Sequence, residues 1–188
     1  SIRRQRQMCI RDSLSSDWDM YHGAAGAFAN PSVGTVDINS IRPNPGINRG
    51  YQPHMLRKDG RLARITAISG PGVYRSDRYP EGYAGAAFIP EPAANAVTCH
   101  WFKETEEGLG KGTHQLFPDK DFEKREFLCS TDERFRPVSI YNGPDGCIYV
   151  VDLYRGILQH RVYVTSFYLK PYILERKLEV PVGMGRIY

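Results

Sequence analysis

RPVSIYNGPDGCIYVVDLYRGILQH, residues 136–160, holds the pattern that decides the fold. Two apolar runs, PVSIY and CIYVV, flank the loop NGPDG at 142–146, whose Pro and Gly residues are typical of a tight turn. The stretch therefore predicts a β-hairpin. The second run is apolar at every position instead of alternating, and an antiparallel strand of this kind needs cover on both faces. Sheets stacked face to face provide that cover, either in a sandwich or as the blades of a propeller.

Much of the remaining chain also predicts strands. Apolar runs separated by Gly, Pro, Asn and Asp begin after Gly60. They cover 62–68, 72–76, 86–92, 96–104, 126–131, 137–141, 147–153 and 157–164. Before them, 14–60 is rich in Gly, Pro, Asn and Ser and is expected to be mostly loop, with one short strand at 35–41. A helical period appears only near 164–178, where Pro171 would interrupt or kink the helix. The expected fold class is mainly β.

An internal repeat favours the propeller over the sandwich. AAFIPEPAANAVTCHWF at 86–102 aligns without a gap on CIYVVDLYRGILQHRVY at 147–163. The alignment pairs Phe88 with Tyr149, Glu91 with Asp152, and Val97 with Leu158. Each copy is expected to form a strand, a short turn and a second strand. Repeated small meanders with insertions confined to loops are typical of propellers.

Composition and charge exclude several classes of protein. Of the 188 residues 41% are hydrophobic, which is enough for a core, and no apolar run approaches the roughly 18 residues of a membrane span. The net charge of +4 is concentrated in 1–13, which holds four Arg against one Asp. The remainder has no basic stripe that would bind nucleic acid. RQRQMCIRDS within 1–13 resembles translated sequencing adapter, so this segment is expected to be non-native and the domain to occupy 14–188.

The cysteines predict neither a metal site nor a haem. Outside 1–13 the chain has Cys99, Cys129 and Cys147, which are widely spaced and form no CxxC pair. This pattern is expected of small buried strand residues rather than of a disulfide framework. Cys99 and His100 lack the first cysteine of a CxxCH motif, so no haem is expected to attach to this chain.

Three stretches resemble a known family of propellers. GVYRSDRYPEGYAGAAFIPEP at 72–92 is similar to a stretch of the six-bladed propellers of the glucose/sorbosone dehydrogenase type. STDERFRPVSIYNGPDGCIYVVDLYRGILQH at 130–160 and PVGMGRIY at 181–188 resemble still more a bacterial subgroup that is often fused to a c-type cytochrome module. The resemblance covers about 45–188. It implies the C-terminal half of a ring, with about three antiparallel blades.

The resemblance also implies a function. It points to a periplasmic or otherwise extracytoplasmic protein and, for the best known members, to pyrroloquinoline quinone (PQQ) with calcium. The implied activity is oxidation of a sugar or alcohol, with electrons passed to a cytochrome c partner. The alternative is a non-catalytic propeller that serves as a binding or scaffold module, because this chain holds no self-sufficient catalytic motif. Since half a ring leaves blade faces open, the isolated chain is expected to be inactive.

Propeller topology would gather charged residues at one rim. In a blade with strands A to D, the loops from D to the next A and from B to C lie at the same end. The segment 130–136 is then a D to A loop and 153–156 a B to C turn, while the turn after 86–91 reaches the same end from the preceding blade. The expected cofactor-binding or substrate-binding residues at this rim are Glu91, Asn95, Asp132, Arg134, Arg136, Asp152, Tyr154 and Arg155.

Each rim candidate has a structural alternative. Glu91 and Asp152 would be calcium or substrate ligands in one interpretation, and caps of turns or partners of an arginine in the other. The arginines would hold a quinone carboxylate or sugar hydroxyls, or else form salt bridges between blades. His54, in the long loop before the first blade, is a further binding candidate, against a plain surface histidine. His100 and His160 are expected inside strands away from the mouth, which disfavours a role as catalytic base.

Overall fold

The computed structural model describes residues 37–43, 47, 50–102, 104–105, 108–109 and 112–188. The regular structure of this part of the chain is mainly antiparallel strands, with one short α-helix, which confirms the expected mainly β class. The segment predicted to be non-native, 1–13, lies outside the described residues.

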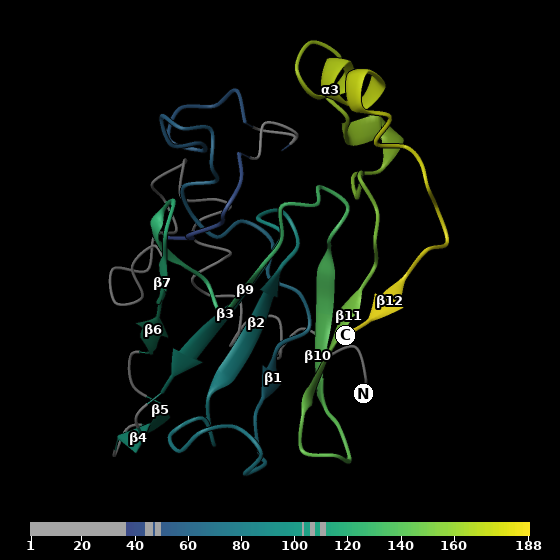
Figure 1. The fold of residues 1–188 in the computed structure, drawn as a ribbon. Coiled ribbons are helices and arrows are strands. Elements are labelled where there is room, and N and C mark those ends of the chain that lie inside the picture. Colours follow the sequence, from purple (N-terminus) through teal and green to yellow (C-terminus); the bar gives the residue numbers. More distant parts are fainter. Residues whose placement is uncertain (1–36, 44–46, 48–49, 103, 106–107, 110–111) are drawn as a thin grey trace.

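Two antiparallel sheets form the body of the described part (Figure 1). The larger sheet has the order β1 (Gly72–Val73), β2 (Ala87–Glu91), β3 (Ala96–Trp101) and β6 (Thr113–Gln115), and β9 (Leu128–Cys129) also pairs with β3. The smaller sheet has the order β10 (Pro137–Asn142), β11 (Ile148–Asp152) and β12 (Arg186–Ile187). Two separate pairs join β4 (Glu104–Thr105) to β5 (Gly108–Leu109), and β7 (Phe117–Asp119) to β8 (Glu123–Arg125).

The predicted hairpin is confirmed. Strands β10 and β11 are antiparallel, with Ile140 opposite Val150. At the turn, the Gly143 N–H donates to the carbonyl of Cys147 at 2.7 Å, and the Cys147 N–H donates to Oδ1 of Asp145 at 3.1 Å. Gly146 has φ +80°, a conformation that glycine adopts without steric cost. Local turn chemistry therefore closes this hairpin.

The strand predicted at 157–164 is wrong. These residues form loop and a 3₁₀ turn, η2 (Arg161–Tyr163), and the side chains of Val162 and Tyr163 are exposed. Strand β12 lies beside β11 instead, with Ile187 opposite Val151. Both 157–164 and 186–187 contain apolar residues, and periodicity in the sequence does not indicate which of them pairs with the edge of β11. His160 consequently lies outside any strand, whereas His100 lies in β3 as predicted.

The repeat survives in its first arm alone. Strands β2 and β11 occupy equivalent places in their sheets, and Glu91 and Asp152 end them. In the second arm Val97 lies in β3 and pairs with Pro90 of β2, whereas Leu158 is in loop. The gapless alignment therefore predicted the equivalence of the carboxylates correctly, whereas its prediction of an equivalent second strand is wrong.

Several predicted strands are shorter or irregular. The runs at 72–76 and 126–131 keep two strand residues each. The described part of 35–41 and the run at 62–68 contribute isolated bridges, such as Asp37 with Arg64, rather than strands. Their apolar residues still pack into a buried cluster, composed of Ile38, Ile47, Leu62, Ile65, Ala94 and Ala96. The apolar pattern in these runs thus reflects burial rather than strand pairing.

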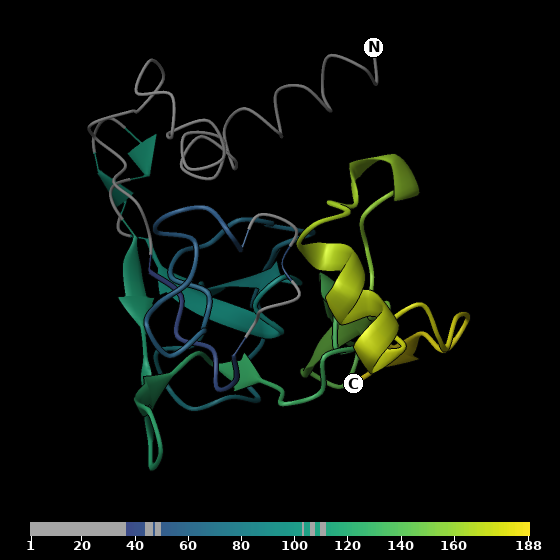
Figure 2. The same cartoon turned by 90° about the horizontal axis from the view of Figure 1, so that it is seen from above.

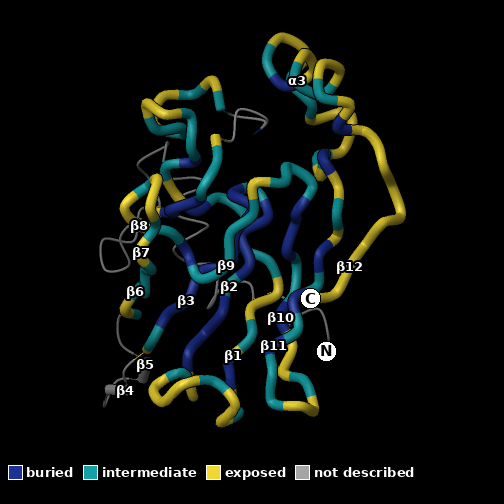
Figure 3. Tube along the Cα trace, in the orientation of Figure 1, coloured by how far each residue is buried: buried dark blue, intermediate teal, exposed yellow. Residues whose placement is uncertain are grey.

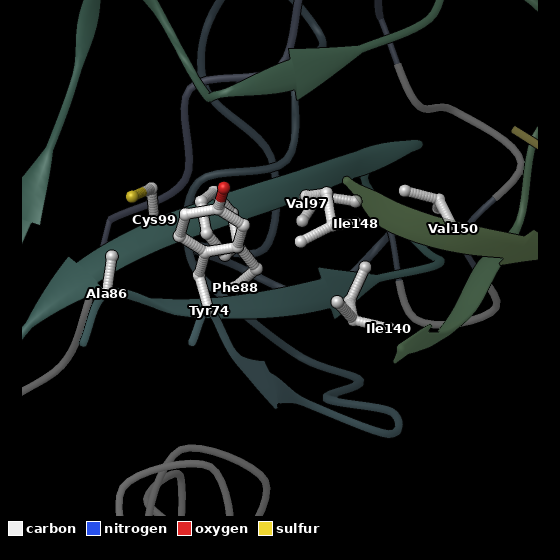
Figure 4. Packing of buried hydrophobic residues seen from close by; sticks show 8 residues of the cluster. All are labelled: Tyr74, Ala86, Phe88, Val97, Cys99, Ile140, Ile148 and Val150. Atoms are coloured by element: carbon white, nitrogen blue, oxygen red, sulfur yellow. The ribbon is translucent and has the colours of Figure 1, made fainter. Parts of the chain in front are cut away.

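The main core fills the space between the two sheets (Figure 4). The larger sheet and its flanking turns contribute Tyr74, Ala86, Phe88, Val97 and Cys99, and the smaller sheet contributes Ile140, Ile148 and Val150. Buried positions follow β2 and β3 almost without a break (Figure 3). In β11 the intervening Tyr149 and Val151 are half-buried, so its second face is covered less fully than its first.

The two sheets meet along their first strands. Gly70, just before β1, forms a parallel bridge with Ser139 in β10. The Gly70 N–H donates to the carbonyl of Val138 at 2.9 Å, and the Gly70 carbonyl accepts from the N–H of Ile140 at 3.0 Å. A Cβ on Gly72 would lie 2.7 Å from Cγ2 of Ile140, so this approach requires glycine. The antiparallel units are thus joined side by side with their first strands in the same direction, neither as one continuous sheet nor as a closed barrel.

The predicted helix is present as α3 (Leu169–Arg176). Pro171 lies in its first turn, where the missing N–H has no intrahelical acceptor, so the helix is not broken. The ring centroids of Phe167 and Tyr51 are 4.9 Å apart. This contact places the segment just before α3 beside the loop that contains Tyr51 (Figure 2). In the described residues, no helix has the length and apolar character needed to cross a membrane.

Candidate functional site

The loops predicted to share a rim lie together at one end of the two sheets. The side-chain amide of Asn95 donates to the carbonyl of Phe135 at 2.6 Å and to that of Glu133 at 3.3 Å. The Arg136 guanidinium donates to the carbonyl of Pro92 at 2.7 Å. Because these bonds join the turn after β2 to the loop before β10, residues from two successive units meet at the rim.

Glu91 is fully buried and accepts hydrogen bonds from the backbone on both sides of its strand. Its Oε1 accepts from the N–H and hydroxyl of Thr66, at 2.7 and 3.0 Å, and from the Ala67 N–H at 2.9 Å. Its Oε2 accepts from the N–H groups of Ala93 and Ala94, at 2.7 and 3.4 Å. A carboxylate has about four lone-pair directions, so these five donors fill its capacity to accept hydrogen bonds. Glu91 serves here as a cap for two loops.

Asp152 is the equivalent residue of the second unit, with one difference. Its Oδ1 accepts from the N–H groups of Arg136 and Tyr154, both at 2.7 Å. Glu91 and Asp152 therefore each cap the turn that follows their own strand. However, Oδ2 of Asp152 is buried and has no hydrogen-bond partner within the described part of the chain. Leaving a polar atom unpaired in this way is costly and uncommon.

Arg136 is a buried cation that binds carbonyl oxygens. Besides Pro92, its guanidinium donates to the carbonyls of Arg155 and Gly156, at 3.0 and 2.8 Å. Burial, followed by the nearby charge of Arg42, lowers the pKa of Arg136 to about 10, so it remains protonated at neutral pH. Its donors are directed to the backbone and hold the rim loops together.

Arg42 completes the rim, although sequence reasoning missed it. Its guanidinium donates to Oδ1 of Asn95 and to Oε1 of Glu133, both at 2.7 Å. Arg176 of α3 binds the same carboxylate oxygen of Glu133. Burial lowers the pKa of Arg42, and Glu133 opposes that effect. Arg42 comes from a loop without periodicity, so the residue pattern around it gave no signal of this position.

Of two further rim candidates, Asp132 stabilises its own loop and Arg134 binds the segment that follows the helix. Oδ1 of Asp132 accepts from the Arg134 N–H at 2.9 Å. The Arg134 guanidinium donates to the carbonyls of Lys177 and Val180, at 3.1 and 3.0 Å. A cation at these last carbonyls is favourable at a helix C-terminus.

Tyr154 and Arg155 lie in the turn after β11. Tyr154 has φ +47°, and the guanidinium carbon of Arg186 lies 3.7 Å from the centre of its ring. This distance is that of a cation–π contact. Arg155 is exposed, and its carbonyl is the group that joins the rim network.

His54 lies in a different place from the rim network. It has φ +68° and lines an open hollow of about 290 Å³. The other lining residues are Asp37, Leu56, Arg57, Ala63 and Arg64. The sequence singled out His54 but not the arginines that accompany it.

A second polar network, not predicted, is buried beside β3 and β6. Glu126 is fully buried; its Oε2 lies 2.6 Å from Nε2 of His114, and its Oε1 accepts from the Asn39 N–H at 2.7 Å. The His100 and His114 rings stack with centroids 4.5 Å apart, and Nε2 of His100 lies 2.8 Å from the Thr98 hydroxyl oxygen. Burial and then His114 lower the pKa of His100 to about 4. His100 is therefore neutral at physiological pH.

The described residues do not fit the expected calcium site. Among them, no group of three or more His, Cys, Asp or Glu side chains is arranged to hold a metal ion. Glu91 already accepts from five donors, and Asp152 offers one oxygen atom without a partner. Calcium takes six to eight oxygen ligands, so these two carboxylates do not form its site.

Comparison with known proteins gives a family. A family model described as a domain of unknown function, DUF7133, matches residues 20–188. The chain belongs to the DUF7133 family. The match includes every residue that the structure describes, and hence both sheets, the rim and α3. No curated protein and no solved structure matches the chain. The function of this DUF7133 domain is therefore inferred from its geometry and from the resemblance of its residues.

Proposed function

We propose that the two sheets are successive blades of a β-propeller of the glucose/sorbosone dehydrogenase type. We further propose that they serve as a non-catalytic scaffold or binding module in a cytochrome-containing, extracytoplasmic protein. The parallel contact of Gly70 with Ser139 supports the blade arrangement, because first strands run in the same direction around a propeller axis. The resemblance of 130–160 supports the family and its cytochrome partner.

One observation carries the scaffold role: in the described residues, the buried side-chain polar atoms of the rim are bonded to the protein itself, with the exception of Oδ2 of Asp152. The carboxylate of Glu91, the amide of Asn95 and the guanidinium of Arg136 all bind neighbouring loops. A binding pocket for a cofactor needs convergent polar groups that retain capacity for the ligand. The rim instead uses its polar groups to join one blade to the next.

A quinoprotein sugar or alcohol dehydrogenase is the second candidate, and Oδ2 of Asp152 favours it. A ligand bound at the rim would offset the cost of this buried, unpaired oxygen. Such an enzyme would use PQQ and calcium, and the cofactor ligands other than Asp152 would come from elsewhere in the ring. Arg134 and Arg136 already bind backbone carbonyls. No step of the oxidation is therefore assigned to this chain.

A cofactor titration separates the two candidates. The protein that contains this chain is incubated with PQQ and Ca²⁺, and its melting temperature and its reduction of a dye are measured with a panel of sugars and alcohols. The scaffold predicts neither a quinone-dependent rise in melting temperature nor turnover. Both effects, lost in Asp152→Asn and retained in the exposed control Arg78→Gln, would establish the dehydrogenase and contradict the scaffold.

A binding assay tests the scaffold directly. A soluble c-type cytochrome is titrated against the immobilised protein in its oxidised and reduced forms. The scaffold predicts saturable binding that does not depend on PQQ. Absence of binding at both low and physiological salt would contradict it.

A further inference from the structure

The hollow beside His54 is held in shape by the backbone. Asp37 and two short segments, 54–57 and 63–64, supply its lining residues. The Ala63 N–H donates to the Met55 carbonyl at 3.0 Å, and the carbonyl of Ala63 accepts from Ile38 at 3.3 Å. These segments rest on the buried cluster that contains Ile38, Leu62 and Ile65. Backbone hydrogen bonds and core packing therefore hold the shape of the hollow, which reduces the ordering that binding requires.

The charges of the lining residues favour an anion. Arg57 and Arg64 outnumber Asp37, and the imidazole of His54 can add a hydrogen bond. Arg57 is half-buried, and its guanidinium is positioned by a bond of 2.7 Å to the Ile38 carbonyl. A guanidinium fixed in this way binds carboxylate or phosphate with little loss of side-chain freedom. Arg64 and His54 are exposed and accessible to a solute.

The backbone of His54, at the hollow, has an uncommon conformation. Its φ of +68° lies in the left-handed region, which non-glycine residues seldom adopt. The turn is held by a bond of 3.3 Å from the Met55 N–H to the Gln52 carbonyl. Strained positions of this kind cluster at binding sites, where the surrounding structure maintains them.

We propose that this hollow binds a small organic anion, with Arg57 and Arg64 holding its carboxylate or phosphate group. Leu56 and Ala63 provide an apolar wall for the carbon skeleton, and Asp37 accepts from ligand hydroxyl groups. A volume of about 290 Å³ suits a small molecule rather than a polymer. None of the residues that line the hollow belongs to the rim network, so the site is independent of the proposed scaffold role.

The test is a calorimetric titration of the chain with three probes: inorganic phosphate, gluconate and neutral glucose. We expect saturable binding of at least one anion, weakened by added salt, and no binding of glucose. Tighter binding of gluconate identifies a carboxylate ligand, and tighter binding of phosphate identifies a phosphate ligand. Arg64→Gln should weaken binding by about tenfold, because it removes one charge-assisted contact.

Arg78→Gln is the matched control, since Arg78 is an exposed arginine outside the hollow. It should bind the anion as tightly as the parent chain. Equal melting temperatures of the two variants and the parent chain would show that the loss in Arg64→Gln is not a folding defect. Absence of saturable anion binding, equal affinity for glucose, or equal affinities of the two variants would overturn the proposal.

Discussion

The guanidinium of Arg136 donates a hydrogen bond of 2.7 Å to the carbonyl oxygen of Pro92, across the boundary between the two sheets. The same side chain binds the carbonyls of Arg155 and Gly156, so one buried cation joins the ends of both units. Through this relationship, the rim joins the two sheets to each other.

Arg136→Met should lower the free energy of unfolding by about 3 kcal/mol, because carbonyl oxygens lose a charged donor inside the protein. Urea denaturation measures the effect. Arg155→Gln is the control, since its side chain is exposed and only its carbonyl joins the network. A change below about 1 kcal/mol in Arg136→Met would contradict the structural role.

The two equivalent carboxylates should respond differently to neutralisation. Glu91→Gln should destabilise the chain by about 2 kcal/mol, because an amide NH₂ group would face backbone N–H donors. Asp152→Asn should cost less than about 1 kcal/mol, because the amide oxygen can replace Oδ1 while the NH₂ group takes the place of the unpaired Oδ2. Thermal denaturation of both variants checks this order. Equal losses would show that Oδ2 has a partner in solution.

His100 should make stability depend on pH. Its pKa is about 4 in the folded chain and 6.5 in the unfolded chain, so the unfolded chain binds the extra proton. Its contribution is fully present above pH 6.5 and is lost as the pH falls to about 4, by at most about 3 kcal/mol. Unfolding measured at several pH values should show a smaller loss for His100→Gln over this range. His160→Gln, at an exposed position, should keep the parent profile, and identical profiles for both variants would refute the assignment.

Gly156 should not tolerate a side chain. A Cβ at this position would lie 2.8 Å from Cα of Leu178 and still closer to its carbonyl oxygen. Because the obstacle is backbone, Gly156→Ala should cost roughly 3 kcal/mol. Gly185→Ala is the control, since its Cβ would lie 3.4 Å from the nearest atom, an ordinary contact. Similar denaturation midpoints for the two variants would show that 177–178 does not pack on Gly156 in solution.

The parts of the fold that could be predicted are those set by neighbouring residues. The turn at 142–146 closes through bonds within its own five residues and their flanks, so its composition sufficed. Glu91 and Asp152 were found by alignment because each follows an apolar strand and caps the next turn. Their capping role, one of the two alternatives considered, follows from the same local geometry.

The candidate site depends more than the fold does on contacts between residues that no sequence pattern connects. Arg42 binds Asn95 and Glu133 from a loop without a periodic pattern. His114 and Glu126 pair because β6 and β9 both lie beside β3, and Glu126 comes just before β9. Residues this far apart meet through packing, so spacing along the chain carries no information about them.

By itself the sequence determined the β class, the hairpin at 137–152 and the positions of the two capping carboxylates, because short-range hydrogen bonding and apolar patterning act within a few residues. Only the tertiary structure decided that β12 rather than 157–164 pairs with β11, and that Arg42 completes the rim. Such choices depend on which of several apolar or charged segments best fits an edge or a buried site. That competition is resolved when the whole chain packs.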